Sequence, residues 1–578
     1  MKKLVLFLLL FAALAAFIFF LVKKKENENP FTQSASPITP DSTGDLWFKQ
    51  ASIYTLDVEV FQDSDGDGIG DINGLIQRLG YIDSLGATVI WLAPFQPTPN
   101  KDDGYDISDY YAVDPHLGTE DDFRKLVAAA NQKGMKIIMD LVVNHTSNQH
   151  PWFQQGRQSD TSPFHSWYVW SKERPKNYNE GMVFPGVQES IWTFDSIAGE
   201  YYYHRFYDFQ PDLNVQNPAV LAEVRKIIKY WLDAGVAGFR LDGVPFFIEV
   251  PQTKGKEFDH QYGILNQLHQ YVQSLRKDAI ILGEANVPPK ENNHYFGERG
   301  EGMQMMFNFF VNQHLFYALA TGDAKPLKEA LEATSSIPKA SQWAQFLRNH
   351  DEVDLGRLSN SDREKVYTAF GPEANMQLYD RGIRRRLAPM MHNNRKELEL
   401  AYSLLFSLPS TPVVRYGDEI GMGDDLRLPE RYAVRTPMQW SAERQGGFTT
   451  AVKAVRPVID TGAFRYENIN VMKERRDSSS LLTWMKRMIR LRKACPEIGF
   501  GSWKLMNTDS PNVLAIQYDW QGKTLIVLHN FSHESQAIKT DGWKLKMPFY
   551  DIRALKQITT DGSLTLPGYG YCWLRSIE

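Results

Sequence analysis

The stretch DDFRKLVAAANQKGMKIIMDLVV, residues 121–143, shows the pattern that decides the fold. Its first part, Asp121–Lys133, carries apolar residues at helical spacing, and its last part, Lys136–Val143, is a short apolar run typical of a buried strand. The same alternation begins near residue 50 and continues to about residue 416. Strands separated by helices in this way predict a parallel sheet of the α/β class.

Seven such apolar runs are clear, and Met303–Phe309 is a weaker eighth. Eight strands predict a closed (β/α)8 TIM barrel, although a doubly wound sheet would also fit the alternation. The seven clear runs are Ile53–Val60, Thr88–Ala93, Lys136–Val143, Gly238–Gly243, Ala279–Gly283, Ala344–Leu347 and Pro412–Tyr416.

Two further regions interrupt the alternation. Residues from about 146 to 210, after the third strand, are rich in Trp, Tyr, Pro, Gly and Ser and predict a small inserted domain. Antiparallel strands follow the helical segment Leu481–Lys493. We therefore expect a barrel domain over residues 46–495 and a C-terminal antiparallel β-sandwich domain over residues 496–578. Its clearest strands are Val513–Tyr518, Thr524–Asn530 and Tyr571–Arg575.

The N-terminal residues predict export. Leu4–Val22 is an apolar run with lysines on both sides, long enough for one membrane span. A cleaved signal peptide would leave an exposed apolar run at the start of the mature chain, so residues 1–25 are better interpreted as an anchor. Residues 26–45 are polar and proline-containing, which is typical of a tether. The protein is thus expected to be membrane-anchored or secreted, with the orientation undetermined.

Charge and cysteine content exclude other classes. The net charge is −5 and no basic stripe is present, so nucleic acid is not an expected partner. Cys495 and Cys572 are the only cysteines and cannot form a disulfide scaffold, so we expect two buried free thiols. No organic cofactor is expected.

Charged residues stand where the predicted strands end. The active site of a (β/α)8 barrel lies at the C-terminal ends of its strands. A carboxylate directly after an apolar run is costly unless it is paired or functional. Because Asp242, Glu284 and Asp351 end the fourth, fifth and seventh strands, they should converge on one pocket. The other polar residues at strand ends are Asp140, Asn144, His145, Arg240, Asn349 and His350.

Three carboxylates around one pocket are what retaining glycoside chemistry needs: a nucleophile, an acid/base and a stabiliser of the distorted sugar. Arg240 lies two residues before Asp242, so both side chains point to the same side of the strand. A guanidinium there would keep Asp242 ionised. The acid must instead stay protonated near neutral pH, which neighbouring carboxylates favour.

Four segments carry a resemblance to a known family. They are similar, in the same order, to the signature motifs of the α-amylase family of glycoside hydrolases. By that resemblance Asp242 is the nucleophile, Glu284 the acid/base and Asp351 the transition-state stabiliser. His145, Arg240 and His350 would line the sugar site. The four segments are Asp140–His145, Gly238–Asp242, Gly283–Asn286 and Phe346–Asp351.

Further segments resemble the trehalose synthase and oligo-1,6-glucosidase branch of that family. The resemblance implies that Asp102, Tyr105 and Arg435 bind the non-reducing glucose. In the related glucosidases a bulkier valine next to the nucleophile accompanies a preference for α-1,6 bonds, so by this resemblance Gly243 implies α-1,4-linked substrates such as maltose or malto-oligosaccharides. These segments are Gln210–Asn214, Gly382–Pro389, Tyr416–Asp424 and Arg435–Trp440.

Three functions stay open at this stage. The first is rearrangement of maltose into trehalose through a glucosyl–Asp242 intermediate, which requires a pocket that excludes water. The second is an exported α-glucosidase or α-amylase-type hydrolase. The third is a non-catalytic amylase-like ectodomain of a membrane complex, although such a relative would lack one or more of the three carboxylates.

The acidic loop at residues 63–71 predicts a structural calcium site. Carboxylates at its positions 1, 3, 5 and 9, with a glycine at position 6, follow the first part of an EF-hand loop, but position 12 is Gly74. The alternative is an acidic turn whose glycines permit tight bends. The expected ligands are the side chains of Asp63, Asp65, Asp67 and Asp71 and the carbonyl oxygen of Ile69.

Overall fold

The computed structural model describes residues 46–250, 259–540, 543, 549–558 and 562–576. The predicted anchor (1–25) and tether (26–45) lie outside the described residues. Among the helices that the structure does describe, none has the length and apolar character needed to cross a membrane.

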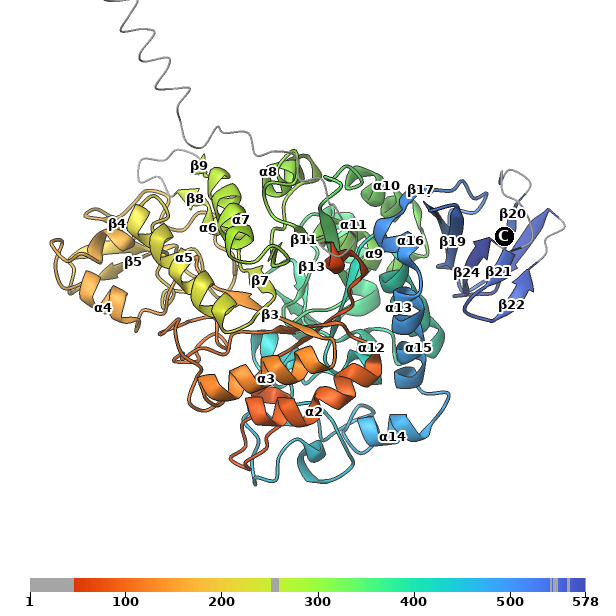
Figure 1. Cartoon of the computed structure of the whole chain (residues 1–578), viewed down its shortest axis with the longest axis horizontal. Coiled ribbons are helices and arrows are strands. Elements are labelled where there is room, and N and C mark those ends of the chain that lie inside the picture. Colours follow the sequence, from red (N-terminus) through yellow and green to blue (C-terminus); the bar gives the residue numbers. More distant parts are fainter. Residues whose placement is uncertain (1–45, 251–258, 541–542, 544–548, 559–561, 577–578) are drawn as a thin grey trace, which may run out of the picture. The chain divides into compact units, whose positions relative to one another are not determined.

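The core of the fold is a closed parallel barrel (Figure 1). Its first strand pairs with both the second and the last, with Ile53 beside Val89 and Val413, so the sheet has no edge. The eight-stranded barrel is confirmed, including the weak strand near Met303, and a doubly wound sheet is excluded. In spatial order the strands are β1 (Ile53–Leu56), β2 (Val89–Leu92), β3 (Lys136–Leu141), β7 (Gly238–Leu241), β10 (Ile280–Gly283), β11 (Met305–Phe307), β12 (Gln342–Phe346) and β16 (Thr411–Arg415).

The barrel interior is filled by side chains. Trp91, Phe307 and Phe346 form part of one buried apolar cluster, in which the Trp91 and Phe307 rings lie 5.4 Å apart. Such filling makes the barrel a packed core without a channel, so an active site must lie at an end of the barrel and not inside it.

Amphipathic helices cover the outside of the barrel. α3 illustrates how the sequence starts one: Thr119 and Asp122 form a capping box at its N-terminus, and its buried face includes Phe123 and Leu126. The principal helices are α2 (Ile72–Leu85), α3 (Glu120–Gln132), α5 (Pro218–Asp233), α7 (Gly263–Leu275), α9 (Phe309–Thr321), α10 (Lys325–Ala333), α11 (Asn360–Phe370), α13 (Arg395–Ser407) and α15 (Leu481–Lys493).

The predicted insert after the third strand is confirmed. It holds the short helix α4 (Pro151–Gly156) and a three-stranded sheet of β4 (Trp170–Ser171), β6 (Glu200–Tyr203) and β5 (Trp192–Asp195). Phe153, Tyr168 and Tyr202 form its own small core. The insert returns to the barrel at a bridge between His145 and Asp212, so its beginning and end meet at the end of β3.

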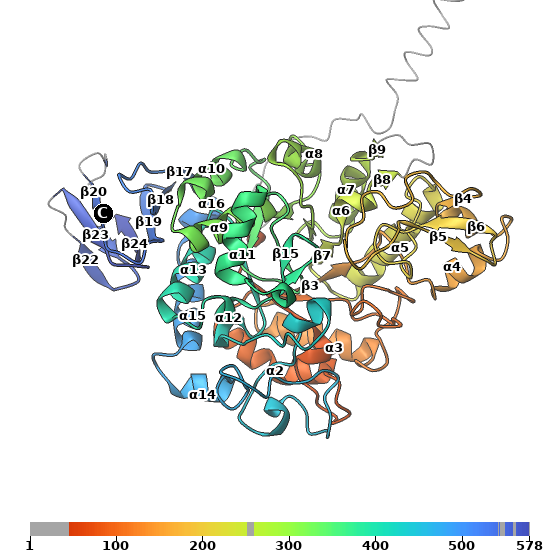
Figure 2. The same cartoon turned by 180° about the vertical axis from the view of Figure 1, so that it is seen from behind.

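The C-terminal domain has two antiparallel sheets that share a core, as expected (Figure 2). Val513 and Ile526 of the larger sheet pack in one cluster with Ile538 and Leu566 of the smaller. Both cysteines are buried and free. The larger sheet is β17 (Ser502–Leu505), β18 (Val513–Trp520), β19 (Lys523–Asn530), β24 (Tyr571–Ser576), β21 (Phe549–Asp551) and β22 (Lys556–Ile558), and the smaller is β20 (Gln536–Lys539) and β23 (Ser563–Leu566).

Candidate active site

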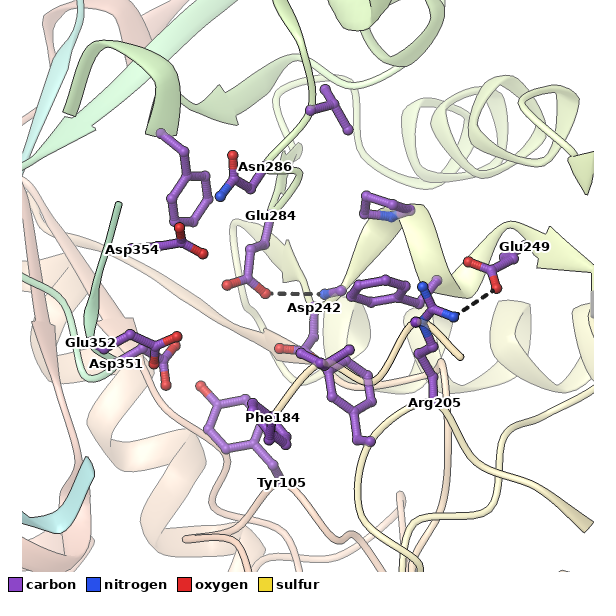
Figure 3. A pocket seen from close by; sticks show the side chains of 18 of the residues that line it. Tyr105, Phe184, Arg205, Asp242, Glu249, Glu284, Asn286, Asp351, Glu352 and Asp354 are labelled. Carbon is purple, nitrogen blue, oxygen red and sulfur yellow. Dashed lines mark hydrogen bonds and ion pairs between the residues drawn. The ribbon is translucent and has the colours of Figure 1, made fainter. Parts of the chain in front are cut away.

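A cavity of about 510 Å³ lies at the C-terminal ends of the barrel strands. Figure 3 shows Asp242, Glu284 and Asp351 facing one another across it. The structure therefore brings the three predicted carboxylates together, as the strand-end argument requires. The other predicted site residues in its wall are Asp102, Tyr105, His145 and His350.

Arg240 joins the carboxylates from below the cavity. Its Nη1 donates to Asp242 Oδ1 at 2.5 Å and to Asp140 Oδ1 at 3.0 Å. Its Nη2 lies 2.9 Å from Glu284 Oε2. The guanidinium is only 1 % exposed, so it acts on the carboxylates with little screening by solvent. The predicted pairing with Asp242 is present, and Arg240 supports the site without lining the cavity.

The Asp242 and Glu284 carboxyls have different proton affinities. Burial raises the pKa of Asp242 to about 6, against the pull of Arg240. Burial, together with the charges of Asp242 and Asp351, raises the pKa of Glu284 to about 7, although Arg240 opposes this and Gly243 N–H donates to Glu284 Oε2 at 3.1 Å. At neutral pH the site can therefore hold an ionised Asp242 beside a protonated Glu284.

Asp351 is held ionised. Burial opposes its charge, but Arg431 at 2.8 Å, Arg435 at 3.0 Å and His350 Nε2 at 2.9 Å outweigh burial and hold its pKa well below the usual range. A fixed negative charge beside the cavity suits a residue that stabilises positive charge on a sugar ring.

Tyr105 and His350 form one wall of the cavity. Their rings are stacked with centroids 5.3 Å apart. The Tyr105 hydroxyl donates to Asp140 Oδ2 at 2.9 Å and lies 2.8 Å from His350 Nε2. Burial lowers the pKa of both His145 and His350 to about 4, so both rings are neutral at pH 7 and can donate or accept hydrogen bonds.

Arg431 is a site residue that the sequence interpretation missed. It lines the cavity and bridges two carboxylates, with Nη2 on Asp102 Oδ1 at 2.7 Å and Nη1 on Asp351 Oδ1 at 2.8 Å. Arg435, which was predicted to bind the sugar, lies behind the wall and is 1 % exposed. It donates to the His350 carbonyl at 2.8 Å and to Asp103 at 2.8 Å. Both arginines belong to one segment, and no local signal tells which one faces the cavity.

The insert closes over the cavity through contacts with loops that follow β12 and β16. The Tyr207 and Tyr379 hydroxyls both donate to Glu430 Oε2, at 2.7 and 2.6 Å. Arg381 Nη1 donates to the Val183 carbonyl at 2.7 Å. None of these contacts could be predicted, because they join segments about 50 to 220 residues apart.

The acidic loop gathers three of its four carboxylates. One carboxylate oxygen from each of Asp63, Asp65 and Asp71 lies within 4.8 Å of the others. Asp67 lies outside this group and instead accepts a hydrogen bond from Ile69 N–H at 2.7 Å. The loop glycines also have a packing role, because a Cβ on Gly68 would lie 2.3 Å from the Lys453 carbonyl oxygen. The oxygen-only donor set fits a hard cation such as calcium.

A (β/α)8 barrel with ionisable carboxyls arranged around a buried arginine at its strand ends defines a class, the barrel enzymes that act on glycosidic bonds. The model of the α-amylase catalytic domain matches residues 53–501. The chain belongs to the α-amylase family and is an enzyme of that family.

Its relatives refine this placement. The chain is 38 % identical over 552 residues to the trehalose synthase/amylase TreS of Mycolicibacterium smegmatis, covering 92 % of this chain and 93 % of that protein. It is 31 % identical to the oligo-1,6-glucosidase of Parageobacillus thermoglucosidasius, covering 86 % and 92 %. Among solved structures, the α-amylase from H. orenii superposes with a TM-score of 0.73 at 27 % identity, covering 92 % of this chain and 100 % of that one.

The two arginines should respond differently to replacement. Arg431→Gln should lower kcat/KM on an α-glucoside about 100-fold, because Asp102 and Asp351 lose the group that positions them. Arg435→Gln should mainly destabilise the fold, by about 3–5 kcal/mol, since it breaks the buried ion pair with Asp103. Its contact with Asp351 at 3.0 Å makes a smaller loss of kcat/KM expected as well. Steady-state kinetics and thermal melting distinguish the two. A similar loss of melting temperature in both variants, with unchanged kcat/KM for Arg431→Gln, would refute this assignment.

Proposed function

We propose that the protein is a retaining α-glucosyl enzyme that rearranges maltose into trehalose. The observation that carries the proposal is the Arg240 network, which brings Asp242 and Glu284 together at one cavity and joins them to the buried Asp140. The similarity to trehalose synthases supports the choice of reaction, with 38 % identity over 92 % of this chain for the Mycolicibacterium protein. A non-catalytic ectodomain would not need all of these residues in place.

In the proposed mechanism, Asp242 attacks the anomeric carbon of the non-reducing glucose while Glu284 protonates the glycosidic oxygen. This step breaks the α-1,4 bond, forms a β-glucosyl–Asp242 ester and releases glucose. Asp351 stabilises the positive charge on the sugar ring. Glu284, now a carboxylate, then removes a proton from the anomeric hydroxyl of the released glucose, which attacks the ester. Two inversions give an α-linked product and restore both carboxyl groups.

Isomerisation also requires that the released glucose stays and that water stays out. The contacts that close the insert over the cavity support this requirement, because Glu430 ties Tyr207 of the insert to Tyr379. Phe184, also in the insert, packs on Tyr207 with ring centroids 4.7 Å apart and lies under Arg431. The insert thus contacts the residues that hold Asp102 and Asp351.

The turn after Asp242 supports an α-1,4 substrate. Gly243 has φ +49°, and a Cβ there would lie 3.2 Å from the Phe206 ring and 3.5 Å from the Phe246 ring. A larger residue would therefore narrow the cavity beside Asp242 and Glu284. The small residue keeps this part of the cavity open, which agrees with the α-1,4 preference that the family resemblance implies.

Incubation with maltose tests the function. Trehalose should be the main product, and proton NMR of the reaction should show retention of the α-configuration. Asp242→Asn and Glu284→Gln should each lower turnover by several orders of magnitude, about 10⁴-fold or more, without loss of fold. Glucose alone as the product would establish the alternative, an α-glucosidase, and an initial β-anomer would rule out retention.

The pH dependence follows from the two raised pKa values. Activity should fall as the pH drops through about 6, because Asp242 takes up a proton. It should also fall as the pH rises through about 7, because Glu284 loses its proton. Because Asp242 and Glu284 interact, the acidic and alkaline limbs of the pH profile report apparent pKa values of the pair of carboxyls. With α-glucosyl fluoride, whose leaving group needs no acid, Glu284→Gln should lack the alkaline limb. An alkaline limb that persists in this variant would contradict the role of Glu284.

We also propose that the loop of residues 63–71 binds calcium. Asp63, Asp65 and Asp71 supply the carboxylates that lie together. The proposed ligands further include the Ile69 carbonyl oxygen and Asp67, whose side chain would have to turn toward the ion from its contact with Ile69 N–H. Calcium at about 100 times its Kd should stabilise the fold by about 2.7 kcal/mol. Asp65→Asn should remove that response with little other effect, since Asp65 is exposed and, among the described residues, its side chain accepts a hydrogen bond from the neighbouring Asp67 N–H. Unchanged melting on chelation, with no metal in elemental analysis, would refute calcium binding.

Residues 1–25 are proposed to anchor the enzyme to a membrane, on the basis of the apolar run Leu4–Val22. Deleting them should give a soluble enzyme with unchanged kcat, and fractionation of cells should move the enzyme from the membrane to the soluble fraction. A full-length chain that is already soluble and uncleaved would contradict the anchor.

A further inference from the structure

We infer that Arg205 and Glu249 bind the acceptor sugar and thereby decide whether the glucosyl group passes to a sugar or to water. This inference rests on the proposed function and names residues for it that the cleavage steps do not use.

The two residues form an ion pair in the wall of the cavity. Arg205 Nη1 lies 3.5 Å from Glu249 Oε1, and the two side chains are 12 % and 4 % exposed. Both line the same cavity as Asp242 and Glu284. Arg205 follows β6 in the insert, whereas Glu249 follows the short helix α6 (Val244–Phe247), which starts directly after the Asp242–Gly243 turn. The pair therefore links the insert to the segment that carries the proposed nucleophile.

The pair lies on the acceptor side of the site. Arg431 contacts both Asp102 and Asp351, so these residues lie together on one side of the site. Figure 3 shows Arg205 and Glu249 on the other side of both Asp242 and Glu284. The sugar released by cleavage must leave on the side of the glycosidic oxygen that Glu284 protonates. Glu284 accepts from the Gly243 N–H, and Gly243 packs against Phe206 and Phe246.

The surroundings of the pair give it the features of a sugar-binding surface. Phe206 and Phe246 form a T-shaped aromatic pair with centroids 5.3 Å apart, and the Arg205 guanidinium lies over Phe246 at 4.8 Å. Tyr203 donates to Glu249 Oε1 at 3.2 Å, which orients the carboxylate. Aromatic rings offer an apolar surface to the C–H groups of a pyranose. A guanidinium beside a carboxylate offers donors and acceptors to its neighbouring hydroxyls.

Stability alone does not account for the pair. Removing two charges from water costs free energy that their attraction often fails to recover, so a buried ion pair is weak evidence of a stabilising role. Its position in the cavity wall instead suits two side chains that bind a ligand in the cavity.

The test measures how the glucosyl–enzyme is partitioned. The donor is p-nitrophenyl α-glucoside with an isotopically labelled glucosyl group, and added glucose is the acceptor. Chromatography then gives the ratio of labelled disaccharide, formed by transfer to glucose, to labelled glucose, formed by hydrolysis. Arg205→Gln and Glu249→Gln should each lower this ratio at least about tenfold and raise the glucose concentration needed for half-maximal transfer. Arg205→Lys, which keeps the charge without the planar fork, should give an intermediate ratio.

A matched control comes from the same insert. Arg157 and Asp195 form an ion pair at 2.6 Å with side chains 22 % and 3 % exposed, and neither lines the cavity. Arg157→Gln and Asp195→Asn should therefore leave the ratio unchanged. If the Arg205 and Glu249 variants lose rate with an unchanged ratio, or if the control variants lower the ratio equally, the inference is wrong.

The failure of the proposed function would look different. If the wild-type enzyme forms only glucose from maltose, the proposed isomerisation is wrong. If the same enzyme still transfers the glucosyl group to added glucose, the acceptor role of Arg205 and Glu249 can still be tested by the ratio. If the wild-type enzyme transfers to no sugar at any glucose concentration, the acceptor role is overturned as well.

Discussion

The buried guanidinium of Arg240 is the charge on which the rest of the site depends. It contacts Asp140, Asp242 and Glu284, and it is 1 % exposed. Without it, three carboxyls would share a region of low polarity with no positive partner, and the pKa of each, including that of the proposed nucleophile Asp242, would rise further. The barrel places Arg240 on β7 with its side chain toward the strand ends. The fold itself therefore supplies the positive charge that the three carboxyls require.

Burial raises the pKa of both reacting carboxyls, and the same arginine opposes the rise at each of them. Asp242 has the 2.5 Å contact with Arg240 and a pKa of about 6. Glu284 faces the charges of Asp242 and Asp351 and has a pKa of about 7. This separation allows one group to attack while the other donates a proton. Asp351 has arginine partners of its own and stays ionised.

Arginines also connect the loops around the cavity. Arg431 joins Asp102 to Asp351, Arg381 reaches from the loop beyond β12 to Val183 in the insert, and Arg205 reaches from the insert to Glu249. A planar guanidinium can hold two partners at once, so each residue fixes the position of one loop relative to another. A cavity closed in this way is polar at its rim and aromatic near Gly243, which suits an occupant with hydroxyls on its edge and C–H groups on its face.

The sequence by itself determined the alternating strands and helices, the insert, the C-terminal sheets and the convergence of Asp242, Glu284 and Asp351, whereas the structure decided between a closed barrel and a doubly wound sheet. These features follow from local patterns, because apolar runs and helical spacing define the strands and helices. The last residues of all parallel strands also lie at the same end of a barrel. Only the tertiary structure decided that Arg431 and not Arg435 faces the cavity, that Asp67 lies outside the acidic group, and that Arg205 meets Glu249. Side chains on loops are placed by contacts with segments far away in the chain, and such contacts leave no periodic signal in the sequence.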